Sequence, residues 1–428
     1  MFKKTTKRFS ISLLVLILFL SPLGYFKSVK ADTFKPQTAT SVYDDLTGNY
    51  GLLGIASQFH IFAKGNTTLN THTNGNIATA NLIGNTNFGT NIKSEETEHV
   101  AVEYSYIQNI TSINGSSEIS DQAGRSTKFV LGNAVKTELV DNGNAVSVNG
   151  TKLDHIKAAS IYQDSATSTY IDFASEFSKL NAASTTLASQ VASQVASQVV
   201  ESSDFSDMNN RVIDFSNAAA TDQIFISIDA DVLSASTPLK ISNPNGAMLV
   251  FNVVGASDSL NINSKIEYGT RVNHETETFS DAKIMWNFGN SLKTLNVNAP
   301  FQGTVLAPEA AVTAYQNLDG SIIATDVTIN AESHRWDLAP VSITAASIVD
   351  PSTSESTSSS SSLSTSQESS TPQSSSSSST QESSTPQSSS SSSTQESSTP
   401  QSSSSSSTQE SSTPQSSSSS STQESSTP

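Results

Sequence analysis

The sequence lacks cysteine entirely. No disulfide framework can therefore stabilise the chain, so a stable fold must rest on an adequately large hydrophobic core. The same absence excludes a thiol nucleophile and sortase-type chemistry. Between residues 32 and 340 the chain is long enough for two ordinary domains or for one extended domain.

Basic residues are also scarce, since 22 Lys and Arg stand against 39 Asp and Glu and give a net charge of −17. Nucleic acids are bound through clusters of Lys and Arg. Beyond the N-terminal segment, the basic residues of this chain are scattered and form no run of three. We therefore expect no nucleic-acid partner, and binding to anionic lipid surfaces is disfavoured for the same reason.

Long apolar runs are missing except near the N-terminus. A basic segment, Lys3–Arg8, precedes an apolar run, Ile11–Leu20, and Val29-Lys30-Ala31 supplies a small-x-small cleavage site. This order is typical of a secretory signal peptide, and the run is shorter than the roughly 20 residues that span a bilayer. We expect residues 1–31 to be removed, which deletes six cations and leaves a secreted chain of net charge −23 without membrane insertion.

Motifs of catalysis and metal binding are absent as well. None of the six histidines lies in an HExxH or HxH metal-binding motif; they are His60, His72, His99, His155, His274 and His334. The sequence has no Gly-x-Ser-x-Gly elbow and no Asp-x-Asp-x-Asp-Gly calcium loop. We expect a protein that is not an enzyme, with no catalytic residue, no metal and no cofactor, and the pattern leaves its binding residues unidentified.

Three clusters of polar residues remain candidates for chemistry. Asp229/Asp231 and Glu275/Glu277 are paired carboxylates of the kind that solenoid glycosidases use, although residues i and i+2 of any strand share a face. The segment Glu332–Trp336 joins an acid, bases and an aromatic ring. We expect it to cap the last turn of the fold with a buried ion pair and a Trp lid, and a polar binding spot is the alternative.

Short apolar-polar alternations bounded by Gly and Asn predict many short β-strands. Gly303–Ala307 is echoed by Gly320–Ala324 seventeen residues later, and each copy is followed by a Val-Thr pair. Such spacing is what stacked turns of a β-solenoid require. A β-sandwich whose hairpins resemble one another is the alternative.

One segment predicts a helix. From Asp172 to about Glu201 apolar residues recur at helical spacing, and Asp172 is placed to act as the N-cap. We expect residues 172–201 to dock on the sheet of their own domain rather than form a coiled coil with a partner.

The C-terminal part, residues 341–428, consists mainly of Ser, Thr, Gln, Glu and Pro and repeats a 14-residue unit. Such a composition cannot bury apolar surface, so we expect a disordered, extended stalk. Residues 341–428 contain no Leu-Pro-x-Thr-Gly sorting signal. We therefore expect any attachment to the cell wall to lie beyond Pro428.

Several motifs resemble, in order, those of the choice-of-anchor A family of bacterial surface proteins; they are Gly51–Phe62, Asn74–Ala78, Lys283–Phe288, Gly303–Pro308, Asp319–Ala324 and Glu332–Trp336. The resemblance implies an adhesive domain with an ice-binding-like fold, which is a right-handed β-solenoid of triangular section with one long helix along its side. The segment 172–201 falls where that helix is expected.

We therefore expect a signal peptide (1–31), a linker (32–46), a mainly β adhesive-type solenoid domain (47–340) and the stalk. The protein is predicted to be a secreted or cell-wall-associated adhesin of a Gram-positive-type bacterium that binds host matrix, a glycan or a neighbouring cell. Thr- and Asn-rich strands such as Asn66–Thr73 offer a hydrogen-bonding surface for glycans or extended protein. The alternatives are ice binding and cleavage of cell-wall or other polysaccharides.

Overall fold

The computed structural model describes residues 34–90, 102–118, 126–191, 199–274 and 279–339. The predicted signal peptide and stalk lie outside these residues. The described ranges contain no helix that is long and apolar enough to cross a bilayer.

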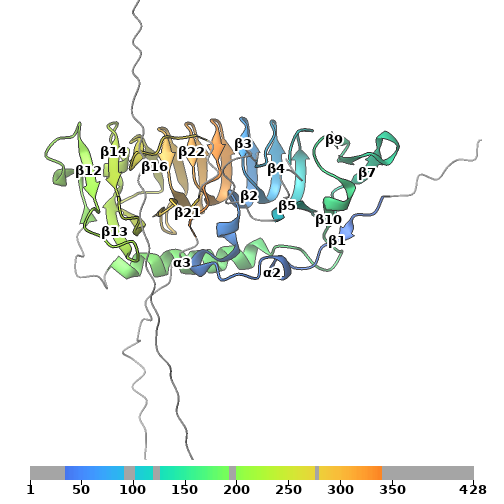
Figure 1. Cartoon of the computed structure of the whole chain (residues 1–428), viewed down its shortest axis with the longest axis horizontal. Coiled ribbons are helices and arrows are strands. Elements are labelled where there is room, and N and C mark those ends of the chain that lie inside the picture. The colour runs from blue at the N-terminus through green and yellow to red at the C-terminus, as the bar shows by residue number, and fades with distance from the viewer. Residues whose placement is uncertain (1–33, 91–101, 119–125, 192–198, 275–278, 340–428) are drawn as a thin grey trace, which may run out of the picture. The chain divides into compact units, whose positions relative to one another are not determined.

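Parallel strands stacked side by side dominate the fold (Figure 1). In spatial order, the main sheet runs through β1 (Gln37–Thr38), β10 (Ile161–Gln163), β6 (Ser126–Leu131), β5 (Val102–Ser112), β4 (Ile77–Gly84), β2 (Ile61–Leu69), β23 (Ile322–Ile329), β21 (Thr304–Ala314), β18 (Ile284–Asn287), β15 (Met248–Val254), β13 (Gln223–Asp229) and β11 (Val199–Val200), while β16 (Ser259–Ile262) pairs with β19 (Thr294–Val297) and β19 with β21. The first long strand of the chain, β2, thus lies in the middle of the sheet, and β23 returns near the end of the domain to pair with it.

The predicted echo is confirmed as strand pairing. Val305 lies opposite Ile322 and Ala307 opposite Ala324, and the two Val-Thr pairs also align, because Thr313 lies opposite Thr328. The alternative of a β-sandwich built from hairpins is wrong, because hairpins pair antiparallel. Among the described strands, only β7 (Thr137–Val140), β8 (Ala145–Val148) and β9 (Thr151–Leu153) pair in that way.

Shorter strands form two further parallel sheets on the side of the stack away from α3. One consists of β12 (Arg211–Asp214), β14 (Leu239–Ser242) and β17 (Ile266–Tyr268), and the other of β20 (Phe301–Gln302), β22 (Leu318–Asp319), β24 (Ser333–His334) and β3 (Thr73–Asn74). The remaining helical segments are α2 (Val42–Asp45), α4 (Ala230–Ser234) and the 3₁₀ segments η1 (Gly51–Gln58), η2 (Asp141–Gly143), η3 (Ala158–Ser160) and η5 (Ser202–Asp204).

Helix α3 (Phe173–Gln190) lies along one flank of the stack (Figure 1). Asp172 caps it as predicted, because its side chain accepts a hydrogen bond from the Ser175 backbone N–H at 3.1 Å. Phe177 is fully buried and its ring stacks on Phe62 of β2 at 5.7 Å between centroids. The expected docking on its own domain is therefore confirmed.

The predicted end of this helix at Glu201 is wrong. The helix ends at Gln190, and Val199 and Val200 form β11, which pairs with β13. Two adjacent β-branched residues suit a strand better than the last turn of a helix. Residues 192–198, which include Val195, lie outside the described residues.

In the main sheet, the first residues of the long strands are buried on both faces of the sheet. In β2, Ile61 and Ala63 belong to the inner core, while Phe62 between them packs beneath α3. Strands covered on both sides read as continuous apolar runs rather than as alternations. The inner core therefore lies within the stack, and a second apolar layer joins the stack to α3.

The expected linker 32–46 is partly wrong. Strand β1 pairs with β10, and Ala39, Val42 and Leu46 are buried in the apolar layer next to α3. Ser41 caps α2 by accepting a hydrogen bond from the Tyr43 backbone N–H at 3.3 Å. Residues 37–46 therefore belong to the folded domain.

Candidate binding surface

A register shift divides each long strand of the main sheet into a first segment, such as Ile61–Ala63 of β2, and a second segment, such as Thr67–Leu69. Helix α3 packs on the first segments, so the second segments form a face that α3 does not cover. Along β19, Leu295 and Val297 are buried, while Thr294 and Asn296 point outward and are partly exposed. Neighbouring strands hold their outward residues in register, and one row comprises Asn261, Asn296, Thr313, Thr328, Thr68 and Ile83. None of these six side chains carries a charge, so the row is an uncharged and partly hydrogen-bonding surface.

Side-chain amides hold parts of this face in place. The Asn296 Nδ2 donates to Asn261 Oδ1 at 2.8 Å. On neighbouring strands, Asn81 Nδ2 donates to Asn66 Oδ1 at 2.9 Å, and Asn66 Nδ2 donates to Asp326 Oδ1 at 3.0 Å. Bonds of this kind between adjacent strands reduce the rotamer freedom that a ligand would otherwise have to remove.

A further row lies one residue beyond the strand ends, and we call it the turn row; it consists of Asn263, Asn298, Tyr315, Asn330, Asn70 and Asn85. From Asn298 to Asn85, each backbone N–H donates to the carbonyl of a strand-end residue on the neighbouring turn. Tyr315 is 49 % exposed and stands among the asparagines.

The prediction for Asn66–Thr73 holds only in part. Asn66, Thr68 and Asn70 are at least partly exposed, whereas Thr67 and Thr73 are fully buried. Thr67 instead donates a hydrogen bond from Oγ1 to Thr79 Oγ1 at 3.0 Å. The period of two along a strand turns every second hydroxyl inward.

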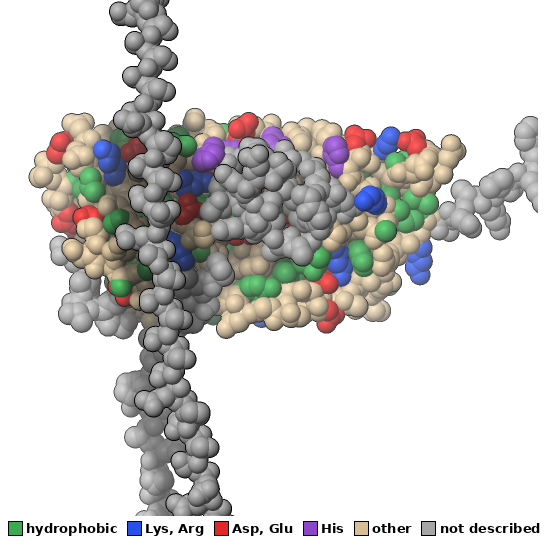
Figure 2. Space-filling view, in the orientation of Figure 1, with side chains coloured by type: hydrophobic (Ala, Val, Ile, Leu, Met, Phe, Trp, Pro, Cys, Tyr) green, Lys and Arg blue, Asp and Glu red, His purple; other side chains and the backbone are tan. Residues whose placement is uncertain are grey.

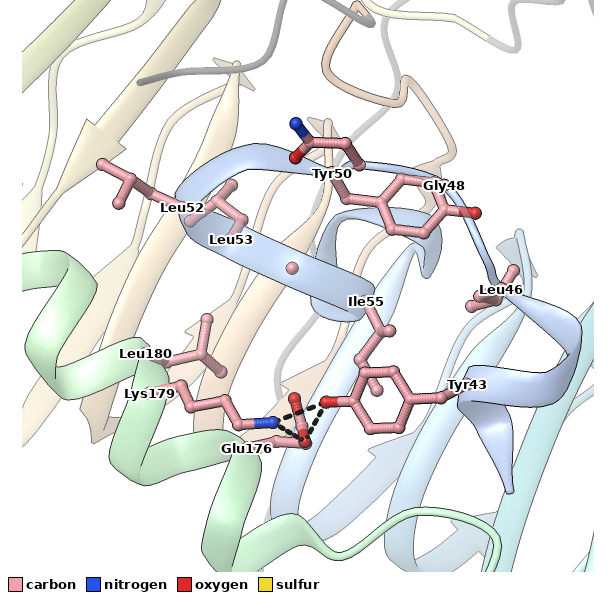
Figure 3. Close-up of a pocket in the computed structure, with 12 residues that line it drawn as sticks. Tyr43, Leu46, Gly48, Tyr50, Leu52, Leu53, Ile55, Glu176, Lys179 and Leu180 are labelled. Carbon is pink, nitrogen blue, oxygen red and sulfur yellow. Dashed lines mark hydrogen bonds and ion pairs between the residues drawn. The ribbon is translucent and has the colours of Figure 1, made fainter. Parts of the chain in front are cut away.

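Two hollows lie near α2 and η1. The first has a volume of about 270 Å³ and an apolar wall that includes Leu53 and Leu180, with a polar group of three at its margin (Figure 3). Lys179 Nζ donates to Glu176 Oε1 at 2.7 Å and to the Tyr43 hydroxyl at 2.6 Å, and that hydroxyl donates to Glu176. Burial and Glu176 raise the pKa of Tyr43, and Glu176 raises the pKa of Lys179.

The second hollow, of about 260 Å³, shares Leu46 and Tyr50 with the first. Its polar lining already has partners within the protein, since Asp45 accepts from Lys128 Nζ at 2.5 Å and Asn76 Nδ2 donates to the Tyr104 carbonyl at 2.9 Å. The bond between Lys128 and Asp45 holds the N-terminal segment on the stack.

The carboxylate pair Asp229/Asp231 does not lie on one strand face. Asp229 ends β13 and caps α4, accepting from the Asp231 backbone N–H at 2.8 Å, and Asp231 stands in α4. The expectation of a shared strand face is therefore wrong, because the chain turns into a helix between the two residues. Glu275 and Glu277 lie outside the described residues.

The segment Glu332–Trp336 contains the expected buried ion pair. Arg335 is 3 % exposed, and its guanidinium lies 3.3 Å from Glu103 and 2.7 Å from Asp337. Trp336 is buried and donates from Nε1 to Asp281 Oδ1 at 2.8 Å.

The expected position of this segment at the end of the stack is wrong. Strand β24 pairs with β22 on one side and with β3 on the other. The segment therefore joins the last turn of the chain to the first, inside the stack.

Buried histidines meet at the same junction. His60 Nε2 lies 2.9 Å from Ser333 Oγ, and His334 Nδ1 lies 2.8 Å from Asp319 Oδ1, where Arg271 also forms an ion pair. Burial, followed by the charges of neighbouring groups, lowers the pKa of His60 to about 3. Sequence spacing could not reveal this cluster, because its members come from separate turns of the chain.

Tyr315 and, apart from Asn70, the asparagines of the turn row were also missed by sequence reasoning. A signal was present, since Tyr315 follows β21 directly, as Asn330 follows β23, within the repeat that the echo defines. Extending the alignment of the two copies by a few residues places these positions opposite each other.

Comparisons with known proteins identify a family. No curated protein matches the sequence. Among solved structures, an ice-binding protein (LeIBP) from Arctic yeast is 15 % identical over 66 % of this chain and 93 % of that chain, with a TM-score of 0.30. An ice-binding protein from the Antarctic ascomycete Antarctomyces psychrotrophicus is 11 % identical over 66 % and 97 %, with a TM-score of 0.27. Superpositions this loose assign no function.

The family model described as "Putative Ice-binding-like adhesive domain" matches residues 52–335. This range covers the strands from β2 to β24, α3 and the uncharged face. The resemblance noted in the sequence is thereby confirmed. The chain belongs to this family of ice-binding-like adhesive domains.

Proposed function

We propose that the protein is a secreted or cell-wall-associated adhesin whose domain binds an extracellular ligand through the face of its second strand segments, centred on the uncharged row from Asn261 to Ile83. The signal-peptide pattern at residues 1–31 supports export, and the serine-rich repeats after residue 340 are suited to displaying the domain away from a cell surface. In this proposal the stacked parallel turns form a right-handed β-solenoid.

The in-register row from Asn261 to Ile83 is the observation that carries the proposal. A stack of parallel strands repeats its outward side chains at about 4.8 Å per strand. Such a surface offers regularly spaced hydroxyl and amide groups to an extended ligand without needing a cleft. Among the described residues visible in Figure 2, acidic and basic side chains are mixed on the face turned to the viewer.

The structural roles of the carboxylates favour binding over catalysis. Asp229 caps a helix, Asp319 is held by Arg271 and His334, and Glu103 faces Arg335. Each of these acids thus has a structural partner. Activity on peptidoglycan or pectin that disappears in an Asp229→Asn/Asp231→Asn double variant would contradict this part of the proposal.

The test compares the full chain with two Thr→Lys variants on an array of glycans and extracellular-matrix proteins. Thr328 stands in the middle of the row, so Thr328→Lys places a charged chain where the ligand would lie. Thr221 is exposed in the loop before β13 and provides the matched control. We expect the ligand to be lost by Thr328→Lys and retained by Thr221→Lys, and equal binding by both variants would refute the face.

Ice binding is the second candidate, and one observation favours it. Thr68, Thr328 and Thr313 stand in register on three adjacent strands. Inhibition of ice recrystallisation by the full chain, lost in Thr328→Lys, would support this candidate. The interruption of the row by Asn296 and Ile83 argues against it.

A further inference from the structure

The amides of the turn row donate hydrogen bonds in one direction. Asn85 Nδ2 donates to Asn70 Oδ1 at 2.8 Å, and Asn70 Nδ2 donates to Asn330 Oδ1 at 2.8 Å. Farther along the stack, Asn298 Nδ2 donates to Asn263 Oδ1 at 3.0 Å. The turn row is therefore an amide ladder with the same polarity on both sides of Tyr315.

Tyr315 interrupts this ladder. Its position lies between Asn298 and Asn330, because β21 lies between β19 and β23. In the part of the chain that the structure describes, no side chain donates to Asn298 Oδ1, and none accepts from Asn330 Nδ2. The tyrosine thus leaves one acceptor and one donor unused on its two sides, and all three side chains are exposed.

An exposed aromatic ring flanked by an amide acceptor and an amide donor matches the chemistry of a sugar. The faces of a pyranose ring carry C–H groups that pack on the electron-rich face of an aromatic ring, and its hydroxyls both donate and accept hydrogen bonds. Asn298 and Asn330 lie two strand spacings apart, about 9–10 Å. That separation is close to the two-sugar repeat of an extended β(1→4)-linked polysaccharide.

Charge and size favour a polysaccharide over a protein. The turn row and the neighbouring row of outward residues carry no charged side chain, which matches a neutral ligand. Six strands of about four residues each present a face of roughly 400 Å². A stable protein–protein interface covers about 800 Å² on each partner, so a single extended chain fits this face better.

We propose that the turn row binds a neutral β(1→4)-linked polysaccharide lying along the stack, with one sugar ring on Tyr315 and adjacent hydroxyls bonded to Asn298 and Asn330. This inference rests on the proposed ligand-binding function and names its ligand class.

Isothermal titration of the full chain with cellohexaose and with chitohexaose tests the proposal. We expect one of the two oligosaccharides to bind, Tyr315→Ala to weaken binding about tenfold or more, and Tyr315→Phe to keep most of it because the ring remains. The matched control is Tyr43→Ala, since Tyr43 on α2 is 48 % exposed and Tyr315 is 49 % exposed. Asn298→Ala should weaken binding and lower the melting temperature only slightly, because its side chain is exposed and makes a single surface hydrogen bond, to Asn263.

Failure of this inference can be separated from failure of the proposed function. If neither oligosaccharide binds, or if Tyr315→Ala binds as tightly as Tyr43→Ala, the saccharide row is wrong. If the wild type nevertheless binds a matrix protein and Thr328→Lys does not, the row from Asn261 to Ile83 is retained as a protein-binding surface. Loss of binding in Tyr315→Phe equal to that in Tyr315→Ala would overturn ring stacking. Absence of any ligand on the array would overturn both proposals.

Discussion

Acid should destabilise this protein through one buried histidine. The His60 side chain is fully buried at the junction between the first and last turns of the chain, with Nε2 2.9 Å from Ser333 Oγ. Burial lowers its pKa from 6.5 to about 3, and the nearby His334 and Arg335 add to the effect. The folded protein therefore keeps this imidazole neutral at pH values where the unfolded chain protonates it.

The sign and size of the effect follow from proton linkage. Between pH 6.5 and about 3 the unfolded state binds one proton more than the folded state, so stability falls as pH falls. The contribution is fully present above pH 6.5 and shrinks by about 1.4 kcal/mol per pH unit below it. At pH 5 the loss from His60 amounts to about 2 kcal/mol, a sizeable share of a typical domain stability.

Urea unfolding of the full chain, followed by the fluorescence of the buried Trp286 and Trp336, measures this loss. The wild type should lose about 2 kcal/mol more between pH 7.5 and pH 5 than His60→Gln, which cannot titrate in that range. The exposed His155→Gln controls for removal of one imidazole and should follow the wild type. Equal pH slopes in wild type and His60→Gln would refute the reasoning, whatever the baseline stability of the variant.

Three further predictions concern stability, each measured by urea unfolding at pH 7.5. Gly320→Ala should cost about 1–3 kcal/mol, because Gly320 has a φ of +140° and an added Cβ would collide with the Gly303 carbonyl; a neutral result would contradict the close approach. Phe177→Ala should cost about 3–5 kcal/mol by opening a cavity under α3, and a loss below about 1 kcal/mol would mean that the helix is loosely docked. Glu103→Gln should cost about 3–5 kcal/mol, since it removes a charge facing the buried Arg335; unchanged stability would show that Asp337 alone suffices.

Local sequence patterns predicted the strands and the helix start well. The seventeen-residue echo indicated which residues in the first segments of β21 and β23 lie side by side, because stacked parallel strands repeat their inward residues. The second segments pair at an offset of fifteen, since a register shift follows Ala307. The cap at Asp172 and the buried Phe177 followed from helical spacing. The helix end was missed because Val199 and Val200 satisfy both the helical spacing and a strand, and pairing with β13 decided between the two.

The candidate surface was less predictable. The Thr- and Asn-rich strands indicated a surface of hydroxyl and amide groups, yet their sequence could not say which threonines face inward. Thr67 and Thr73 are buried while Thr68 is partly exposed, because the bends between successive strand segments set the phase of the alternation. Asp229 and Asp231 show the same limit, since a turn into α4 separates two residues that a continuous strand would have paired.

The sequence by itself determined the many short strands and the docked helix through short-range periodicity, and the family through motifs that occur in order along the chain. Only the tertiary structure decided that β2 pairs with β23, which brings His60, Arg335 and Glu103 together at one buried junction. The same stacking places Tyr315 between Asn298 and Asn330. Such neighbours arise from pairings between residues that lie far apart along the chain, and their geometry exists only once the turns have stacked in register.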